Sequence, residues 1–293
     1  MNLLIIGVKE KVKKIKECIA FFSYFKRALK INEIEELTGH SVKNAELGFC
    51  KQSESHYWMG EEKILSLRKI QDEISAKYLK RALKGAKWLR IIPFIKLIAV
   101  CNTVAFKSAR SNSDIDLFII TDKNRIFTAR ILSTLLIHLI GMRRHRNKII
   151  GRLCLSFYLS ENRLNVGDIR IENDIYMHYW MKTLLPVYER NNMYCKFMNE
   201  NSWINVSTKK KDLMKDEFLF KFFRFPLWLI LITPIGGFIE RILKKWHLRR
   251  FENNKVVLKE DSDIRISEEM LKFHNHDKRK EIREGVERIM NSF

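Results

Sequence analysis

The chain has 293 residues, 46% of them hydrophobic, which is enough to bury a sizeable core and excludes an intrinsically disordered protein. Its 55 Lys and Arg outnumber its 34 Asp and Glu, and the formal net charge of +21 favours polyphosphates, nucleic acid or anionic membrane surfaces as partners, with simple solvated lysine faces as the alternative. The five cysteines show no Cys-x-x-Cys spacing, which argues against a disulfide framework or a zinc site. The N-terminal apolar run precedes its lysines, the reverse of a secretion signal, so we expect a cytoplasmic protein.

The first 75 residues are predicted to form a small module of their own. Their apolar spacing and turn residues indicate three helices and then a hairpin, at residues 12–29, 31–39, 41–49 and 51–60. This order resembles a winged helix-turn-helix module. One function for it is DNA binding through the third helix, with Lys43 and Asn44 on the exposed side. The alternative is a surface for protein packing or dimerisation.

Residues 76–190 are predicted to form an α+β core with a mixed sheet. A long basic helix runs into it from Glu61 to Trp88, and apolar runs then predict strands at residues 97–101, 116–121 and 153–159. A helix that ends at Gly141 separates the second strand from the third. The order strand, strand, helix, strand implies a mixed sheet with flanking helices. Residues 191–293 are expected to form a mainly helical C-terminal region.

One C-terminal segment raises the question of a membrane. Residues 225–239 read FPLWLILITPIGGFI, which is short of the roughly 20 residues that a spanning helix needs and is interrupted by prolines and glycines. We therefore expect buried structure, and membrane association is not the favoured interpretation. Because basic residues flank the segment, shallow insertion at a membrane surface stays open as the alternative.

The segment with the most chemical information is AVCNTVAFKSARSNSDIDLFIIT, residues 99–121. Asp114 and Asp116 stand one residue apart at the start of a predicted strand, so that both carboxylates face the same side while Ile115 points into the core. Two carboxylates so close repel each other unless a cation lies between them. Oxygen ligands favour Mg²⁺ or Mn²⁺, and either ion can bridge the phosphates of a substrate.

These residues resemble the nucleotidyltransferase superfamily, typified by DNA polymerase beta, kanamycin nucleotidyltransferase and the small MNT-type proteins. The family pattern is a strand that ends in Gly-Ser, a loop of roughly ten residues, and then Asp-hydrophobic-Asp on the next strand. Here an apolar strand ends in Asn102-Thr103 and Ser113-Asp114-Ile115-Asp116-Leu117 follows. Most of the chain also resembles poorly characterised bacterial proteins with a nucleotidyltransferase domain.

The resemblance implies that Asp114 and Asp116 are catalytic residues and hold Mg²⁺ or Mn²⁺, with Asn102, Thr103 and Ser113 lining the phosphate pocket. A nucleoside monophosphate would pass from a nucleoside triphosphate to an acceptor hydroxyl, releasing pyrophosphate. The acceptor is open among a small molecule, a protein and RNA, and the basic surface makes nucleic acid a possible partner. Phosphate-binding cations are expected among neighbouring basic residues: Lys107, Arg110, Lys123, Arg143, Arg144 and Arg146.

Two departures from the family pattern concern activity. Asn102 replaces the glycine, although asparagine tolerates positive φ better than most residues. The third predicted strand lacks the usual third carboxylate: Ser156 stands where an acid is expected, and Glu161 and Asp168 lie beyond the strand. Loss of a general base removes on the order of 10²- to 10⁴-fold of rate. The alternative function is therefore a catalytically degenerate, nucleotide-binding regulator that uses the winged-helix-like module to bind DNA or a protein.

Overall fold

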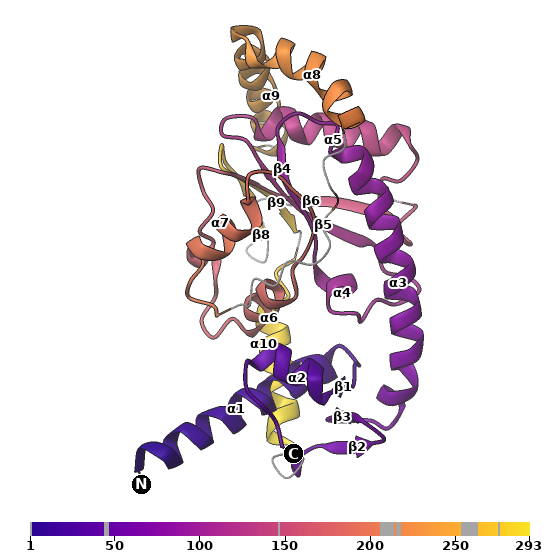
Figure 1. The fold of residues 1–293 in the computed structure, drawn as a ribbon, viewed down its shortest axis with the longest axis vertical. Helices are drawn as coiled ribbons and strands as arrows, with labels where there is room; N and C mark the ends of the chain where they lie inside the picture. Colours follow the sequence, from indigo (N-terminus) through magenta and orange to yellow (C-terminus); the bar gives the residue numbers. More distant parts are fainter. Residues whose placement is uncertain are drawn as a thin grey trace.

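The computed structural model describes residues 2–43, 47–145, 147–205, 214, 218–252, 263–274 and 276–293. Within these residues the chain folds as an α+β protein with a mixed sheet in its middle, a smaller sheet at one end and a helical projection at the other (Figure 1). The predicted α+β class and mixed sheet are thus confirmed.

The main sheet has six strands among the described residues, in the order β7-β4-β5-β6-β9-β8. β5 runs parallel to β6, and the other neighbouring pairs are antiparallel. The strands are β4 (Ile95–Val100), β5 (Ile115–Thr121), β6 (Leu153–Ser160), β7 (Leu185–Glu189), β8 (Asp263–Ile266) and β9 (Met270–His274). The three predicted strands are β4, β5 and β6, each within two residues of its expected bounds.

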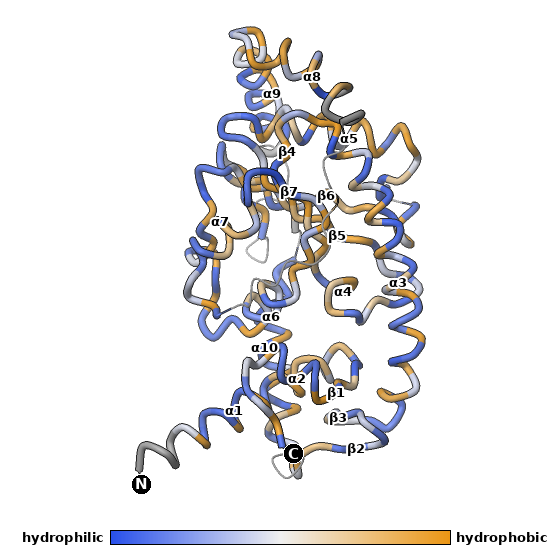
Figure 2. The backbone as a smooth tube through the Cα atoms, in the orientation of Figure 1, coloured by the Kyte–Doolittle hydropathy of each residue, from blue (hydrophilic) through white to orange (hydrophobic). Residues whose placement is uncertain are grey.

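These three strands are mostly hydrophobic along their length (Figure 2). Their side chains are buried on both faces, because helices pack on both sides of the sheet. Leu117 and Ile119 of β5 face α3 and α5, whereas Phe118 and Ile120 face α6 and α7. The helices are α3 (Lys63–Leu89), α4 (Asn102–Ala105), α5 (Ile126–Leu139), the 3₁₀ turn η2 (Gly167–Ile169), α6 (Ile175–Thr183) and α7 (Met193–Glu200). The expected helix before β6 is α5.

The N-terminal region forms the smaller sheet and the helices around it. Its elements are α1 (Asn2–Tyr24), β1 (Leu29–Lys30), α2 (Ile31–Thr38), β2 (Lys51–Ser53) and β3 (His56–Trp58), and the sheet order is β1-β3-β2. The predicted hairpin is confirmed, with Gln52 opposite Tyr57. The first helix begins ten residues earlier than predicted. Of the predicted third helix, residues 41–43 are not helical and residues 44–46, with Asn44, lie outside the described residues.

The long helix α3 connects the two sheets along one side of the molecule (Figure 1). One of its faces is buried along the whole length, including Arg68 and Gln71 beside the small sheet and Ala82 and Ala86 beside the main sheet. Gly85 lets this helix approach β6, since a β-carbon there would stand 2.2 Å from Leu153 Cδ1. The buried face of α3 therefore packs against both sheets, and its opposite face is exposed to solvent.

The C-terminal region is less purely helical than expected. Besides α8 (Phe218–Ile232), α9 (Pro234–Glu252) and α10 (Arg279–Asn291), it supplies β8 and β9, which extend the main sheet next to β6. α10 crosses to the other end of the molecule and packs against α1, where Ile282 and Val286 join the cluster of Ile15 and Ile19. The predicted boundary at residue 191 thus cuts through the main sheet.

The apolar segment at residues 225–239 forms the end of α8, a bend and the start of α9. The expectation of buried structure is wrong for most of it, because six of its apolar side chains are at least 50% exposed: Phe225, Leu229, Ile230, Ile232, Ile235 and Phe238. Among the described helices none is long and apolar enough to cross a membrane alone. The pair Arg224–Ile232 and Pro234–Arg250 passes that test together, with a bend of 83° between its halves.

Candidate metal and nucleotide site

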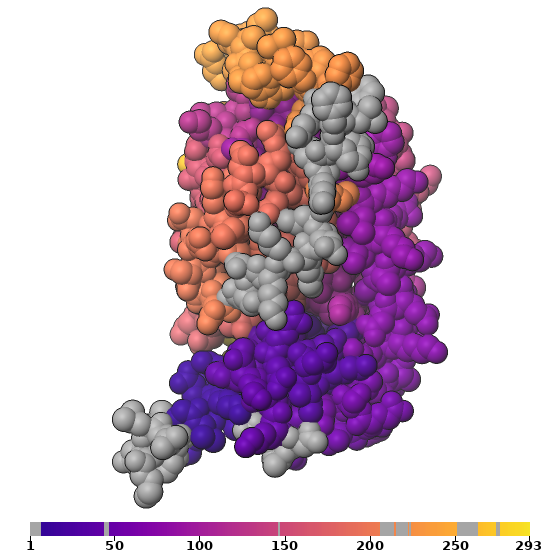
Figure 3. Space-filling view, viewed as in Figure 1, coloured from indigo at the N-terminus to yellow at the C-terminus, as the bar shows by residue number. Residues whose placement is uncertain are grey.

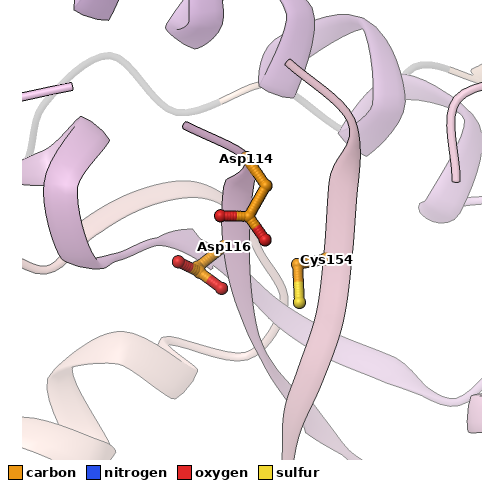
Figure 4. A group of neighbouring side chains, drawn as sticks. All are labelled: Asp114, Asp116 and Cys154. Carbon is orange, nitrogen blue, oxygen red and sulfur yellow. The ribbon is translucent and has the colours of Figure 1, made fainter. Parts of the chain in front are cut away.

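The two predicted carboxylates lie together at the start of β5. Ile115 is fully buried between them in the chain, and Asp114 and Asp116 therefore project on the same side of the strand (Figure 4). Asp114 has a side chain that is 20% exposed. One oxygen of each carboxylate and the sulfur of Cys154 all lie within 4.8 Å of one another.

Cys154 comes from the neighbouring parallel strand β6. Asp116 stands directly opposite Cys154 in the register, and a bulge between this pair and the next one adds a residue to β6. The side chain that β6 presents to the carboxylates is thus that of Cys154, not Ser156 as predicted. Ser156 hydrogen-bonds to the Cys154 thiol.

Asn102 fixes the position of Asp116. It is the first residue of α4, two residues beyond the end of β4, and has a φ of +56°, in the left-handed region that asparagine tolerates. From there its Nδ2 donates to Asp116 Oδ2 at 2.9 Å, and the Tyr176 hydroxyl of α6 donates to Asn102 Oδ1 at 2.8 Å. Three separate elements, α4, β5 and α6, are thus connected through the side-chain amide of Asn102.

Arg144 supplies the positive charge next to the pair. It follows α5, and its Nη1 lies 2.9 Å from Asp114 Oδ2 and 3.4 Å from Cys154 Sγ. The Arg144 side chain is 45% exposed, so it can turn toward solvent or toward a bound anion. Of the basic residues named as phosphate-binding candidates, Arg144 lies at the Asp pair, and Arg146 lies outside the described residues.

Burial and the neighbouring carboxylates raise the pKa values of two side chains at the site, Asp116 and Cys154. Burial and the charge of Asp114 raise the pKa of Asp116 to about 6, although hydrogen bonds from Asn102 and Cys154 and the charge of Arg144 oppose the shift. Burial and the two carboxylates raise the pKa of the Cys154 thiol to about 12. Without a metal ion Cys154 is therefore a neutral thiol at neutral pH, and it becomes a strong ligand only if a cation displaces its proton.

The other predicted residues differ in their closeness to the pair. Thr103 is half-buried and follows Asn102 at the start of α4. Ser113 stands next to Asp114, but its Oγ accepts the backbone N–H of Arg110 at 2.9 Å and so closes the loop. The Arg110 side chain is exposed.

Two predicted lysines belong to other places. Lys107 is exposed and lines a cavity of about 750 Å³ between α2 and α6, which neither Asp114 nor Asp116 lines. Lys123 follows the far end of β5, and at roughly 3.3 Å per residue it stands on the order of 20 Å from Asp116 along the strand. Lys123 is therefore no candidate for a phosphate at the Asp pair.

No third carboxylate joins the pair within the described part of the chain. Glu161 forms an ion pair with Lys96 and accepts the N–H of Lys123, at the far end of β5, and Asp168 pairs with Arg163. Both candidates named from the sequence therefore lie outside the site. Cys154 and Tyr176 were not foreseen there, because no local pattern marks them. Arg144 was expected near the pair as a phosphate-binding residue, but its contact with Asp114 was not.

Comparison with protein-family models, with curated proteins and with solved structures found no match. The chemistry of the site must therefore be argued from its own residues. Two carboxylates and a thiol on adjacent strands are a donor set that a divalent cation fits, provided that Arg144 leaves Asp114. Two hard oxygens suit Mg²⁺ and Mn²⁺, and the sulfur shifts the preference toward the softer Mn²⁺.

Proposed function

We propose that this chain is a metal-dependent nucleotidyltransferase that moves a nucleoside monophosphate from a nucleoside triphosphate to an acceptor hydroxyl. The observation that carries the proposal is the pairing of Asp114 and Asp116 at the start of one strand, with Asn102 donating to the second carboxylate from the start of α4, just beyond the preceding strand. This is the arrangement that the family pattern requires. A bound Mg²⁺ or Mn²⁺ would supply Lewis-acid stabilisation of the charge that develops on the phosphates.

Each residue has a defined task in this reaction. Asp114 and Asp116 hold the metal, and Asn102 orients Asp116 by its hydrogen bond. Arg144 exchanges its contact with Asp114 for the phosphate tail of the substrate, which a guanidinium binds well. The acceptor oxygen bonds to the α-phosphorus, the bond to pyrophosphate breaks, and the proton of the acceptor leaves to water.

Two observations favour a second candidate, a nucleotide-binding regulator without turnover. Cys154 occupies the strand position next to the carboxylates where a further acid is expected, and Arg144 neutralises Asp114 in the absence of metal. The N-terminal region, which we propose to be winged-helix-like, would then transmit nucleotide binding to DNA or a protein partner. Lys43 is exposed there, but residues 41–43 do not form the predicted third helix, so this candidate places Lys43 on a non-helical segment.

Transfer of labelled α-phosphate in the presence of Mn²⁺ or Mg²⁺ tests the first candidate. We expect Asp114→Asn and Asp116→Asn to abolish metal-dependent transfer, whereas Asp168→Asn removes a carboxylate outside the site and leaves transfer unchanged. Metal-dependent nucleotide binding in the wild type without any transfer would favour the regulator. Full transfer by Asp116→Asn would remove the pair from any catalytic role.

A further inference from the structure

The corner formed by α8 and α9 carries two continuous apolar stripes on its outer side. On α9 the stripe repeats at helical spacing of three and four residues and is at least 47% exposed: Ile235, Phe238, Ile242 and Trp246. On α8 it continues with Phe222, Phe225, Leu229 and Ile232, each at least 50% exposed. The corner projects from the end of the molecule opposite the small sheet (Figures 1 and 3).

The bend of the α8–α9 corner is uncharged, and basic residues follow it along α9. Residues 225–239 contain no charged side chain, and the exposed basic residues begin at Arg241 and continue with Lys245, Arg249 and Arg250. Arg250 lies over the Trp246 ring at 5.3 Å. The residues Ile242, Lys245, Trp246, Arg249 and Arg250 line a shallow hollow on the outer side of α9. An apolar floor with a basic rim complements the phosphate and the upper acyl chain of an anionic lipid.

The corner is attached to the body and is not a loose end. Leu231 is 6% exposed and packs with Phe94 and Ala129. The Glu240 carboxylate, 8% exposed, accepts the N–H groups of Phe127 and Thr128 at 2.9 and 2.8 Å. The apolar stripes therefore face outward because the opposite helix faces are already occupied by the fold.

We propose that the α8–α9 corner docks this protein on the surface of an anionic lipid bilayer. The uncharged stretches, residues 225–232 of α8 and 234–239 of α9, are about 12 and 9 Å long at about 1.5 Å per residue. With the bend entering first, the corner therefore reaches a depth close to the roughly 5–10 Å of interfacial helices and falls far short of the roughly 30 Å bilayer core. The basic band then lies at the headgroups, with Trp246 at the boundary, where tryptophan is favoured. A protein partner would instead need a matched apolar surface, whereas acyl chains accept any shape.

Flotation of the full-length protein with vesicles tests this proposal. We expect binding to vesicles of phosphatidylcholine with roughly 30% phosphatidylserine, because each lysine or arginine near an anionic surface contributes about 1 kcal/mol to binding. We expect little binding to vesicles of phosphatidylcholine alone. Phe238→Asp should weaken binding at least about tenfold, because a charge enters the apolar stripe. Ile70→Asp is the matched control on α3, since Ile70 is 53% exposed and Phe238 is 59% exposed. The double variant Lys245→Gln, Arg249→Gln should weaken binding about tenfold or more and reduce its salt sensitivity.

Thermal unfolding of each variant shows whether the fold is intact, and Ile235→Ser serves as a milder change should Phe238→Asp unfold. The proposal is overturned if the wild type binds neither vesicle, or if folded Phe238→Asp and Ile70→Asp bind equally well. It is also overturned if the wild type is a dimer that Phe238→Asp dissociates without any vesicle binding, since a second copy would then cover the stripes. None of these results depends on nucleotide transfer.

Discussion

Asp116 keeps its carboxyl group partly buried beside Asp114, and its pKa of about 6 stands above the ordinary value of 3.8. A carboxyl whose pKa is raised in the folded state stabilises the metal-free protein below pH 4, and that contribution is lost as pH rises through about 6. We therefore expect Asp116→Asn to raise the free energy of unfolding at pH 7 by about 2 kcal/mol. Urea unfolding in the presence of a chelator measures it.

The same substitution should abolish Mn²⁺ binding, because a carboxylate ligand is lost. At pH 4 the gain in stability should be small, since the wild-type carboxyl is protonated there as well. Equal stability of the two proteins at pH 7 would contradict a raised pKa for Asp116. Loss of stability at both pH values would show that the hydrogen bond from Asn102 matters more than the charge.

The sequence alone predicts part of this site. The Asp pair follows from period-two geometry within a single strand, and Asn102 from its place at the end of the previous strand. Cys154 does not, because its position opposite Asp116 depends on the register of two parallel strands and on a bulge that no local pattern reveals. Nothing in the sequence connects Tyr176 to Asn102, and only the fold brings its hydroxyl there.

The strands show a similar limit at the level of secondary structure. β4, β5 and β6 are apolar on both faces and could be predicted, but β7 is five residues long and contains Pro186. β8 and β9 contain Asp263 and Lys272, which are only 7% exposed and form an ion pair. In a sequence, charged residues such as these predict an exposed segment. Asp263 and Lys272 become partners only when β8 pairs with β9 at the edge of the sheet.

The apolar stretch in α8 and α9 is the opposite case. Its composition predicts a buried segment, yet α8 and α9 pack on the body of the protein, including α5, through one face only, and the opposite face of each helix is exposed. Hydropathy measures the affinity of a side chain for a nonpolar environment, and it does not say whether protein or lipid provides that environment.

The carboxylate of Glu240 attaches α9 to the start of α5. Glu240 accepts two backbone N–H groups and the Thr128 hydroxyl at the start of α5, where the helix dipole favours a negative charge. In Glu240→Gln the side-chain NH₂ group, itself a donor, replaces one of the oxygens that accept from Phe127 and Thr128. We expect the amides of Phe127 and Thr128 to exchange hydrogen roughly 10- to 30-fold faster, equivalent to about 1.5–2 kcal/mol.

Hydrogen exchange followed by mass spectrometry or NMR checks this expectation. Glu268→Gln is the control, because Glu268 pairs with Lys244 of the same helix but is 64% exposed. That control should leave exchange at the start of α5 unchanged. Equal exchange in Glu240→Gln and the wild type would mean that apolar packing alone holds α9 in place.

Across the whole molecule, a buried charge network joins the small sheet to the main sheet. Arg27, 1% exposed, donates to Glu33 of α2, to Asp72 of α3 and to the backbone oxygen of Lys107 in the loop that leads toward Asp114. Arg68 of α3 adds a bidentate contact to Glu33, with distances of 2.7 and 3.0 Å. With α10 packed against α1, the two ends of the molecule are connected by several separate segments.

The ionisation of Glu33 should therefore contribute to how the free energy of unfolding of this protein depends on pH in the acid range. Burial opposes its ionisation, but hydrogen bonds from Arg68 and the backbone of Lys30 and the charges of Arg27 and Arg68 outweigh it and lower its pKa from 4.5 to about 2. A carboxyl with a lowered folded-state pKa contributes stability above pH 4.5 that is lost as pH falls toward 2. We expect Glu33→Gln to lose about 3 kcal/mol at pH 7, because two arginines lose their partner.

Urea unfolding at pH 7, 4 and 3 measures this loss. The difference between Glu33→Gln and the wild type should shrink steadily as the pH falls, since the wild-type carboxylate loses its advantage over the same interval. Glu36→Gln on the exposed side of α2 is the matched control and should change stability by less than about 0.5 kcal/mol at each pH. A constant difference at all three pH values would mean that the side-chain shape of Glu33, and not its charge, connects α2 to α3.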